Sequence, residues 1–514
     1  MDTKLLKQKI LDLAIRGKLI PQDPNDEPAS VLLEKIRKEK QELIRQGKIK
    51  KDKNESTIFV GDHKQHYEKF ADGTVKNIEN EIPFDIPETW SWCRFSELFE
   101  LRNGFTPLRS NKLFWENGTM PWFTIDDKHN QGDFINYTAQ HITDIAYKQE
   151  RIVPKDSVLL CCTASIGEVA FNKISLITNQ QFNGITVKST FKSLISPMFL
   201  YYYCKTLKQY LIDIAGATTF GFVSLSKIGK TLFPFPCYSE QQRIVQKIEE
   251  LFAQVDKIEE EKQELLKLID KAKERVLDLA MKGKLVKQDP NDEPASVLLE
   301  KIFEEKKKLA KEGKIKLSKD ELLAPQISDD NDYYQDLPKN WLVLNLGNIC
   351  DVARGGSPRP IDKYLTTSNK DSYNWIKIGD TNIGEKYITK AKQKIIKEGL
   401  SHTRYVEKGD FLLSNSMSFG RPYILKIDGC IHDGWLVIHN TFKLLNQDYL
   451  YYLLSSKFMF EEMSQLAKGS TVKNLKSDTV KLLKIPIPPL LEQIRIVETV
   501  EGLLTKIEQI KGSL

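Results

Sequence analysis

Residues 11–50 read LDLAIRGKLIPQDPNDEPASVLLEKIRKEKQELIRQGKIK, and residues 277–316 read LDLAMKGKLVKQDPNDEPASVLLEKIFEEKKKLAKEGKIK. The two stretches are identical at 29 of 40 positions, without a break from Gln22 to Ile36. Chance does not produce a match of this quality, so the chain contains an internal repeat. The organisation of the whole chain follows from that repeat.

Weaker similarities extend the repeat outward. Ile86–Trp90 corresponds to Leu337–Trp341, and Phe235–Val245 corresponds to Ile487–Val497. Each half is therefore predicted to run from a helical region through a globular domain to another helical region. The predicted divisions are a helical region at 1–50, a polar connector at 51–82, a globular domain at 83–237, a central helical region at 238–316, an acidic connector at 317–334, a second globular domain at 335–489 and a C-terminal helix at 490–514. We expect the connectors to have little internal structure, because they are polar and charged.

Apolar residues spaced alternately by four and three positions form a helical seam, which is typical of a coiled coil. The central seam consists of Ile244, Ile248, Leu251, Val255, Ile258, Leu265, Ile269, Val276 and Leu279, and Gly283 follows it as a helix stop. The C-terminal residues Ile496, Val500, Leu503 and Ile507 repeat its first half. Leu6, Ile10 and Leu13, with Gly17 as the stop, repeat its second half.

The two terminal helices are therefore predicted to meet end to end and to lie antiparallel to the central helix. Such an arrangement is circular and has a pseudo-two-fold axis. All seven tryptophans fall within 83–237 and 335–489, where short apolar runs such as Asp156–Cys162 and Gly409–Ser414 favour strands. The predicted class is α+β, with two mixed α/β globular domains separated by a pair of long antiparallel coiled-coil helices.

The composition and the start of the sequence predict the cellular compartment of the protein. The chain has 514 residues, of which 40% are hydrophobic and 28% are charged. It contains no run of ~18 apolar residues, and its start lacks the apolar core of a secretory signal, so we expect a cytoplasmic protein with no membrane partner. Seven cysteines without a CxxC spacing fit a reducing compartment.

The net charge of +6 is unevenly distributed. The first globular domain has 15 basic and 13 acidic residues, and the second has 22 and 15. The rest of the chain has 39 basic and 42 acidic residues, so the positive excess lies in the globular domains. This distribution indicates a nucleic-acid partner for those domains.

Two pairs of corresponding loops are candidate DNA contacts. In one pair, arginine lies near glycine, a combination that allows close approach of the backbone to phosphate and bidentate binding of guanine. In the other pair, small hydroxyl residues lie beside glycine. An ordinary surface turn with exposed arginines also explains the first pair, and helix capping explains the second pair equally well. The candidates are Arg102, Asn103, Thr106, Arg109 and Lys112, with Arg354, Gly355, Ser357 and Arg359, and Thr218 and Thr219, with Ser470, Thr471 and Lys473.

No catalytic or metal-ligating residues are predicted, and no cofactor is expected in this chain. Gly229-Lys230-Thr231 resembles the end of a phosphate-binding loop, but Ser224 stands where that motif requires glycine. Asp126-Asp127-Lys128 resembles a nuclease cluster, yet its lysine does not repeat in the second half. The sequence also contains neither a dinucleotide-binding GxGxxG nor a methyltransferase Asn/Asp-Pro-Pro-aromatic motif.

The chain resembles the specificity subunits of type I restriction–modification systems. The resemblance is carried by Glu81–Trp90 (EIPFDIPETW), by both GKL…QDPNDEPASVLLEKI blocks and by the Pro-x-x-x-Glu-Gln-x-Arg-Ile-Val start of each long helix. It implies a bacterial or archaeal, DNA-associated protein with two target-recognition domains, each reading one half of a split double-stranded target. The helical regions would act as a ruler and dock two modification subunits.

The same resemblance places catalysis on the partners. The modification subunits would carry S-adenosylmethionine and methylate adenine, and the restriction subunits would use ATP and magnesium. The chain itself would be non-catalytic. Two alternatives from the residues remain open at this point, namely a DNA-modifying enzyme fused to its recognition domains and a structural coiled-coil adaptor.

Overall fold

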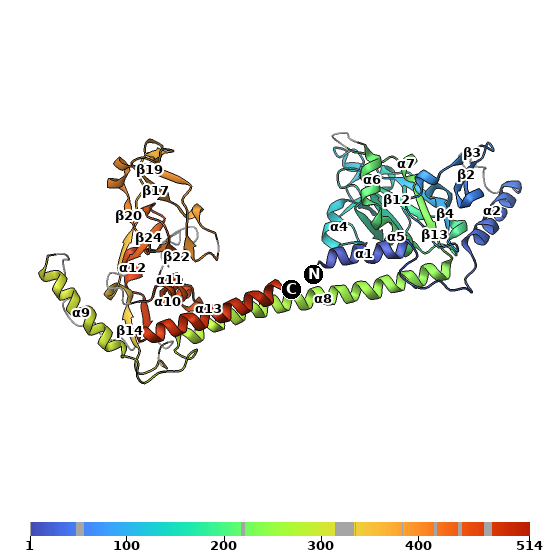
Figure 1. Ribbon diagram of the computed structural model, residues 1–514. Coiled ribbons are helices and arrows are strands. Elements are labelled where there is room, and N and C mark those ends of the chain that lie inside the picture. Colours follow the sequence, from blue (N-terminus) through green and yellow to red (C-terminus); the bar gives the residue numbers. More distant parts are fainter. Residues whose placement is uncertain are drawn as a thin grey trace. The chain divides into compact units, whose positions relative to one another are not determined.

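A computed structural model of the chain divides into two compact units, Met1–Glu261 and Lys262–Leu514. The described residues are 2–47, 56–216, 221–313, 334, 336–382, 384–415, 419–439, 445–466 and 475–514 (Figure 1). Both units combine sheets with helices, so the fold is α+β, as predicted. Within the described ranges, no helix has the length and apolar character needed to cross a bilayer.

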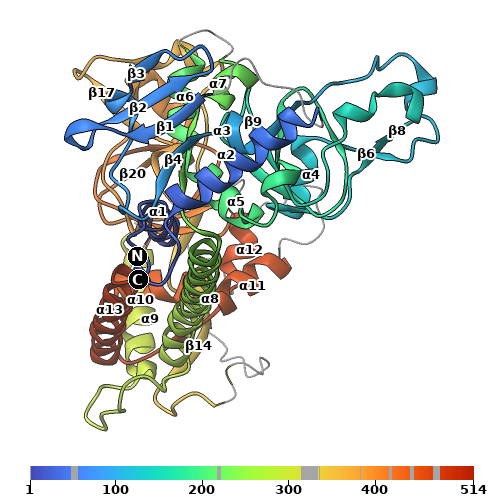
Figure 2. The same ribbon diagram turned by 90° about the vertical axis from the view of Figure 1, so that its right-hand side faces the viewer.

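Unit 1 is built around a five-stranded sheet in the order β5-β12-β9-β10-β7, beside a three-stranded sheet in the order β11-β6-β8. Strand β12 is buried along its whole length, and helix α5 packs its aromatic side chains against the same core. Figure 2 shows β6 and β8 in a lobe that extends from the rest of the unit. The elements are α1 (Thr3–Ile15), α2 (Ala29–Arg45), β1 (Ser56–Val60), β2 (His66–Phe70), β3 (Val75–Asn77), β4 (Ser91–Arg94), α3 (Phe95–Leu98), β5 (Phe99–Asn103), β6 (Met120–Phe123), α4 (Ile125–Gln131), β7 (Phe134–Ile135), β8 (Gln140–Ile142), β9 (Ser157–Cys161), β10 (Val169–Asn172), β11 (Ile177–Thr178), β12 (Phe182–Val187), α5 (Pro197–Thr206), α6 (Lys208–Ala215), α7 (Leu225–Gly229), β13 (Leu232–Phe235) and the first part of α8 (Tyr238–Met281).

Unit 2 repeats this architecture. Its central sheet has the order β15-β24-β21-β22-β18, which matches the central sheet of unit 1 strand for strand, and a second sheet has the order β16-β19-β17-β23-β20. The diverged globular sequences therefore keep one fold. The elements are the last part of α8, α9 (Ala295–Lys311), β14 (Leu342–Asn345), β15 (Asp351–Arg354), β16 (Leu365–Thr366), β17 (Ser372–Ile376), β18 (Tyr387–Ile388), β19 (Gln393–Ile396), β20 (Arg404–Val406), β21 (Phe411–Ser414), β22 (Pro422–Leu425), β23 (Gly429–Ile431), β24 (Trp435–His439), α10 (Gln447–Leu454), α11 (Lys457–Leu466), α12 (Ser477–Lys481), β25 (Lys484–Ile487) and α13 (Leu490–Gly512).

Helix α8 has 44 residues, a length of ~66 Å at 1.5 Å per residue. In unit 1, α1 lies antiparallel to the first part of α8, since Thr3 at the start of α1 donates to Glu259 at 2.9 Å and Gln22, beyond its end, donates to Glu240 at 2.6 Å (Figure 1). In unit 2, α13 lies antiparallel to the last part of α8, since Gln288, beyond the end of α8, donates to Glu492 near the start of α13. Glu508 near the end of α13 pairs with Lys273.

The predicted seam residues differ in how deeply they are buried. Ile244, Ile248, Val255 and Ile269 on α8 are buried, and so are Ile10, Ile496 and Val500 on the terminal helices. Leu251, Val276, Leu6, Leu13, Leu503 and Ile507 are partly buried. In contrast, Ile258 is 39% and Leu265 is 38% exposed. The ends of the seam are therefore closely packed within each unit, and the middle of α8 is more accessible.

Two glycines end the repeated helices, as predicted. Gly17 follows α1 and Gly283 follows α8, and both have a φ of +64°. A β-carbon at either position would lie 2.4 Å from Pro87 or 2.5 Å from Pro338. Only glycine combines the left-handed backbone with this close approach.

The prediction of little internal structure in the connector 51–82 is wrong. Residues 56–77 form the antiparallel sheet β1-β2-β3, which lies against β4. Ile58 and Ile78 pack with Trp92 and Leu232. The sheet is held by these few apolar contacts and by an ion pair to Arg94, which local composition does not reveal. The acidic connector predicted at 317–334 lies outside the described residues, apart from its last position.

Candidate nucleic-acid interface

The first and last strands of each globular domain pair side by side, and the last strand leads into a long helix. In unit 1, β4 pairs antiparallel with β13, and in unit 2, β14 pairs antiparallel with β25. We call each two-stranded pair a stem. The chain therefore enters and leaves each globular domain through the same stem.

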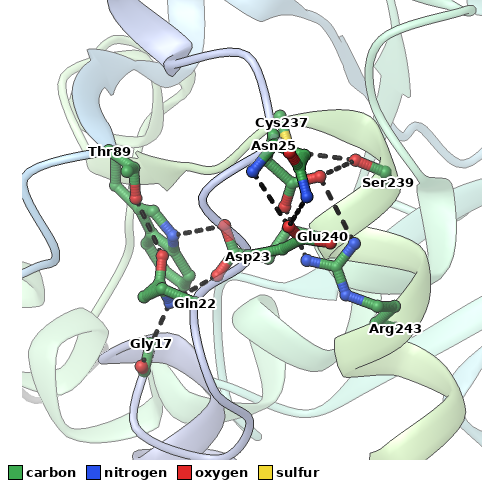
Figure 3. Close-up of polar contacts among 11 residues, drawn as sticks. Gly17, Gln22, Asp23, Asn25, Thr89, Cys237, Ser239, Glu240 and Arg243 are labelled. Atoms are coloured by element: carbon green, nitrogen blue, oxygen red, sulfur yellow. Dashed lines mark hydrogen bonds and ion pairs between the residues drawn. The ribbon is translucent and has the colours of Figure 1, made fainter.

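A buried polar network fixes the stem of unit 1 to the start of α8 (Figure 3). Glu240 accepts from Trp90 Nε1 at 2.9 Å and from Gln22 Nε2 at 2.6 Å. Arg243 donates to Asp26 at 2.5 Å. Burial raises the pKa of Glu240, while the hydrogen bonds from Trp90 and Gln22 act in the opposite direction. The repeated QDPNDEP segment and the Glu-Gln-x-Arg helix start are therefore parts of one junction.

Unit 2 repeats two contacts of this junction. Gln288 donates to Glu492 at 2.6 Å, and Arg495 pairs with Asp292. Pro489 stands at the position of Cys237, so the cluster of Asp26, Cys237 and Glu240 is not repeated as a set of metal ligands. The shared residues hold each globular domain on its helix.

We expect Trp90→Phe to destabilise the protein by ~1–3 kcal/mol more than a matched tryptophan change, because a buried carboxylate loses a donor. Urea unfolding of the full-length protein measures the change in free energy. Trp92→Phe is the matched control, since the buried indole nitrogen of Trp92 donates no hydrogen bond to a described residue. Equal losses from the two changes would contradict the assigned role of the Trp90 hydrogen bond.

The far end of the central sheet of unit 1 carries a compact tip, formed by the loop after β5 and the turn between β11 and β12. The backbone N–H groups of Gly104 and Phe105 donate to Phe182 at 3.1 Å and to Thr178 at 2.9 Å. A β-carbon on Gly104 would lie 1.8 Å from a carbonyl oxygen of this turn, so only glycine fits. The hydroxyl of Thr106 then donates to the carboxamide oxygen of Gln180, which is exposed.

The tip of unit 2 has the same geometry. Gly355 N–H donates to Trp435 at 2.9 Å, and Gly356 N–H donates to Ile431 at 3.2 Å. The hydroxyl of Ser357 donates to Asp433 Oδ1 at 2.9 Å. Ser357 and Asp433 thus occupy the places of Thr106 and Gln180.

Gln180 and Asp433 were missed by the sequence analysis. Each lies two residues before the aromatic residue that opens β12 or β24. That shared spacing is the one signal in the sequence that relates them.

The predicted arginine contact at the first tip has a defined geometry. The guanidinium of Arg109 lies 4.0 Å from the ring centroid of Trp115 and 4.5 Å from that of Trp122, and it donates to Gln140 at 2.6 Å. Arg109, Trp115 and Gln140 line a shallow pocket of about 410 Å³ together with Lys112. The stacking restrains the guanidinium and leaves it at an accessible surface.

The other residues predicted near this tip differ in orientation. Arg102 is paired with Glu100 and donates to Thr186 at 3.0 Å, so its guanidinium is held by side chains of the sheet. The carbonyl of Asn103 accepts from Arg151 at 3.0 Å. Lys112 is 82% exposed and lies 3.6 Å from Glu116.

At the second tip, two of the predicted arginines contact Asp433. Arg354 Nε donates to the Asp433 carbonyl at 3.1 Å, and Arg359, 83% exposed, lies 3.5 Å from its carboxylate. Burial acts to raise the pKa of Asp433, but the hydrogen bond from Ser357 and the neighbouring positive charges bring it below its ordinary value. Asp433 is therefore ionised at neutral pH.

The structure thus brings Thr106, Arg109, Arg354, Gly355, Ser357 and Arg359 to the two tips. Five other predicted contacts, Thr218, Thr219, Ser470, Thr471 and Lys473, lie outside the described residues. A role in binding DNA stays a prediction for all of them.

We expect Arg109→Ala to weaken binding to the specific DNA by ~1–3 kcal/mol if the guanidinium contacts guanine bidentately. Fluorescence anisotropy with the specific duplex and an unrelated duplex measures the loss. Arg45→Ala, on the exposed end of α2, is the matched control. A loss no larger than that of the control would contradict the prediction.

Comparison with known proteins identifies the family. Residues 87–268 and 338–514 each match the type I restriction modification DNA specificity domain. The EcoEI type I specificity subunit of Escherichia coli is 26% identical over 99% of this chain and 90% of its own length. The MjaIX specificity subunit of Methanocaldococcus jannaschii is 26% identical over 79% of this chain and 84% of its own length.

Solved structures show a related fold. The HsdS subunit of Thermoanaerobacter tengcongensis aligns with a TM-score of 0.51 and 17% identity, covering 84% of this chain and 93% of that chain. A structure from a study of complex assembly and conformational transition of the type I R-M system gives a TM-score of 0.52 and 18% identity, covering 84% of this chain and 94% of that chain. The chain belongs to the type I restriction–modification DNA specificity family, whose domain it carries twice.

Proposed function

We propose that the protein is the DNA-recognition subunit of a type I restriction–modification complex, and that each globular domain reads one half of a split target. The observation that carries the proposal is the repeated tip. Both family domains bring a hydroxyl of the loop after β5 or β15 into a hydrogen bond with a polar side chain in the turn before β12 or β24, and arginines lie in the same loops. The equivalent positions hold different side chains, which suits two different half-sites.

The helices would set the distance between the half-sites. In this proposal, α1 and α13 meet end to end along α8, which gives a circular arrangement with a pseudo-two-fold axis. The antiparallel packing of α1 within unit 1 and of α13 within unit 2 supports this arrangement. A repeated helical surface would then dock two copies of one modification subunit.

The chain would contribute recognition and no catalysis of its own. Its repeated polar network is used to join domains to helices. The modification subunits would bind S-adenosylmethionine and methylate adenine, and the restriction subunits would bind ATP and magnesium. The complex would act on cellular DNA in the cytoplasm.

Single-molecule methylation sequencing of cells that carry the chain and its modification subunit tests the proposal. We expect one split motif with methylated adenine in both halves, and we expect deletion of this chain to abolish methylation at that motif. Unchanged methylation after deletion would favour an adaptor. Transfer of label from S-adenosylmethionine to DNA by the purified chain alone would establish a fused enzyme instead.

A further inference from the structure

Gln180 and Asp433 occupy equivalent places on the two tips. Each lies in the turn before strand β12 or β24, and each accepts a hydrogen bond from the hydroxyl that follows the glycine loop. Gln180 is exposed, and the side chain of Asp433 is 42% exposed. The two units therefore present side chains of different hydrogen-bonding character at equivalent positions of the same fold.

We propose that Gln180 and Asp433 are equivalent base-reading residues, Gln180 selecting adenine in one half-site and Asp433 selecting cytosine in the other. The inference rests on the proposed function, because it assumes that the tips contact DNA. It extends that function by naming the residues and the bases that they distinguish.

The chemistry of Gln180 fits adenine. Thr106 donates to the carboxamide oxygen and holds that end of the side chain at the loop after β5. A second lone pair on this oxygen remains for a further bond, and the amide NH₂ donates to no described residue. An acceptor beside a donor complements N6–H₂ and N7 of adenine in the major groove.

The chemistry of Asp433 fits cytosine. An ionised carboxylate is acceptor-only, and cytosine presents its N4 amino group as a donor in the major groove. Guanine and thymine present acceptors there, which a carboxylate repels. Arg354 and Arg359 offset the negative charge of Asp433 near the phosphates.

The test is to exchange the two chemistries in the full-length chain, assembled with its partner subunits. We expect Gln180→Asp to change one base of one half-site from adenine towards cytosine, and Asp433→Gln to make the reverse change in the other half-site. A bidentate contact predicts a change in preference of about 10- to 100-fold. Methylation sequencing measures it, with Gln41→Asp and Asp336→Gln as exposed controls away from the tips.

Two further variants keep the test decisive. Gln180→Ala should relax the preference at the same single base, and Thr106→Val should weaken it without changing its identity. An unaltered motif in all four tip variants would overturn the inference while leaving the proposed function intact. Changes in both half-sites from one variant would overturn it equally. Absence of a split motif with the wild-type chain would instead contradict the proposed function.

Discussion

Exchange of residues 95–231 for the same segment of a family member with another target replaces one half of the split methylated motif and leaves the other half unchanged; this is the result that we expect. The stem explains why. Ser91 on β4 pairs with Phe235 on β13, so a transplanted domain enters and leaves through adjacent strands. The junction of Trp90, Gln22 and Glu240 lies outside the exchanged segment.

The exchanged segment begins after Arg94 so that the chimera keeps this arginine. Arg94 pairs with Glu68 at 2.7 Å and with Glu81 at 2.6 Å, and Glu68 is 5% exposed. Removal of one partner of a buried ion pair costs ~3–5 kcal/mol, so an exchange that discards Arg94 would damage the fold of β1–β3. Methylation sequencing gives the motif of the chimera, and exchange of 346–483 is the reciprocal control. A chimera that alters both halves would contradict separate recognition.

Lengthening α8 by four residues is expected to lengthen the spacer between the half-sites. A second copy of Glu261–Glu264 extends a helix by ~6 Å and rotates the remainder of that helix by ~40°. One base pair rises ~3.4 Å and turns by ~34–36°. We therefore expect a spacer longer by one or two base pairs, with both half-sites unchanged.

The control insertion has the same length but lies outside the proposed ruler. Four residues added after Gly73, where a β-carbon would meet no atom within 4 Å, should leave the spacer unchanged. Methylation sequencing reads the spacer of both variants directly. An unchanged spacer in the α8 variant, with methylation retained, would exclude this helix as the ruler.

The long helices were predictable because their information is local. The four-and-three spacing from Ile244 to Leu279 and the stop glycine Gly283 describe α8 without knowledge of its partners. The core strands were predictable for a similar reason, since β9 and β21 are short apolar runs between turn residues.

The tips and the small sheet depend on contacts that are distant in the chain. Thr106 and Gln180 are brought together by the pairing of β5 with β12, which no local pattern reveals. The polar strands β1–β3 look like a connector because a handful of apolar residues and Arg94 hold them. Arg109 was found through its glycine-containing loop, but its two tryptophan neighbours were not.

The small sheet β1–β3 makes the two halves of the chain chemically unequal. In β14 of unit 2, Val343 and Asn345 stand where β4 has Trp92 and Arg94. Neither replacement offers a guanidinium to two carboxylates, so the means of anchoring such a sheet is specific to unit 1. If two identical subunits dock on the repeated helices, they face different neighbours. A cross-linker or an inhibitor directed at β1–β3 would then distinguish one member of the pair from its twin.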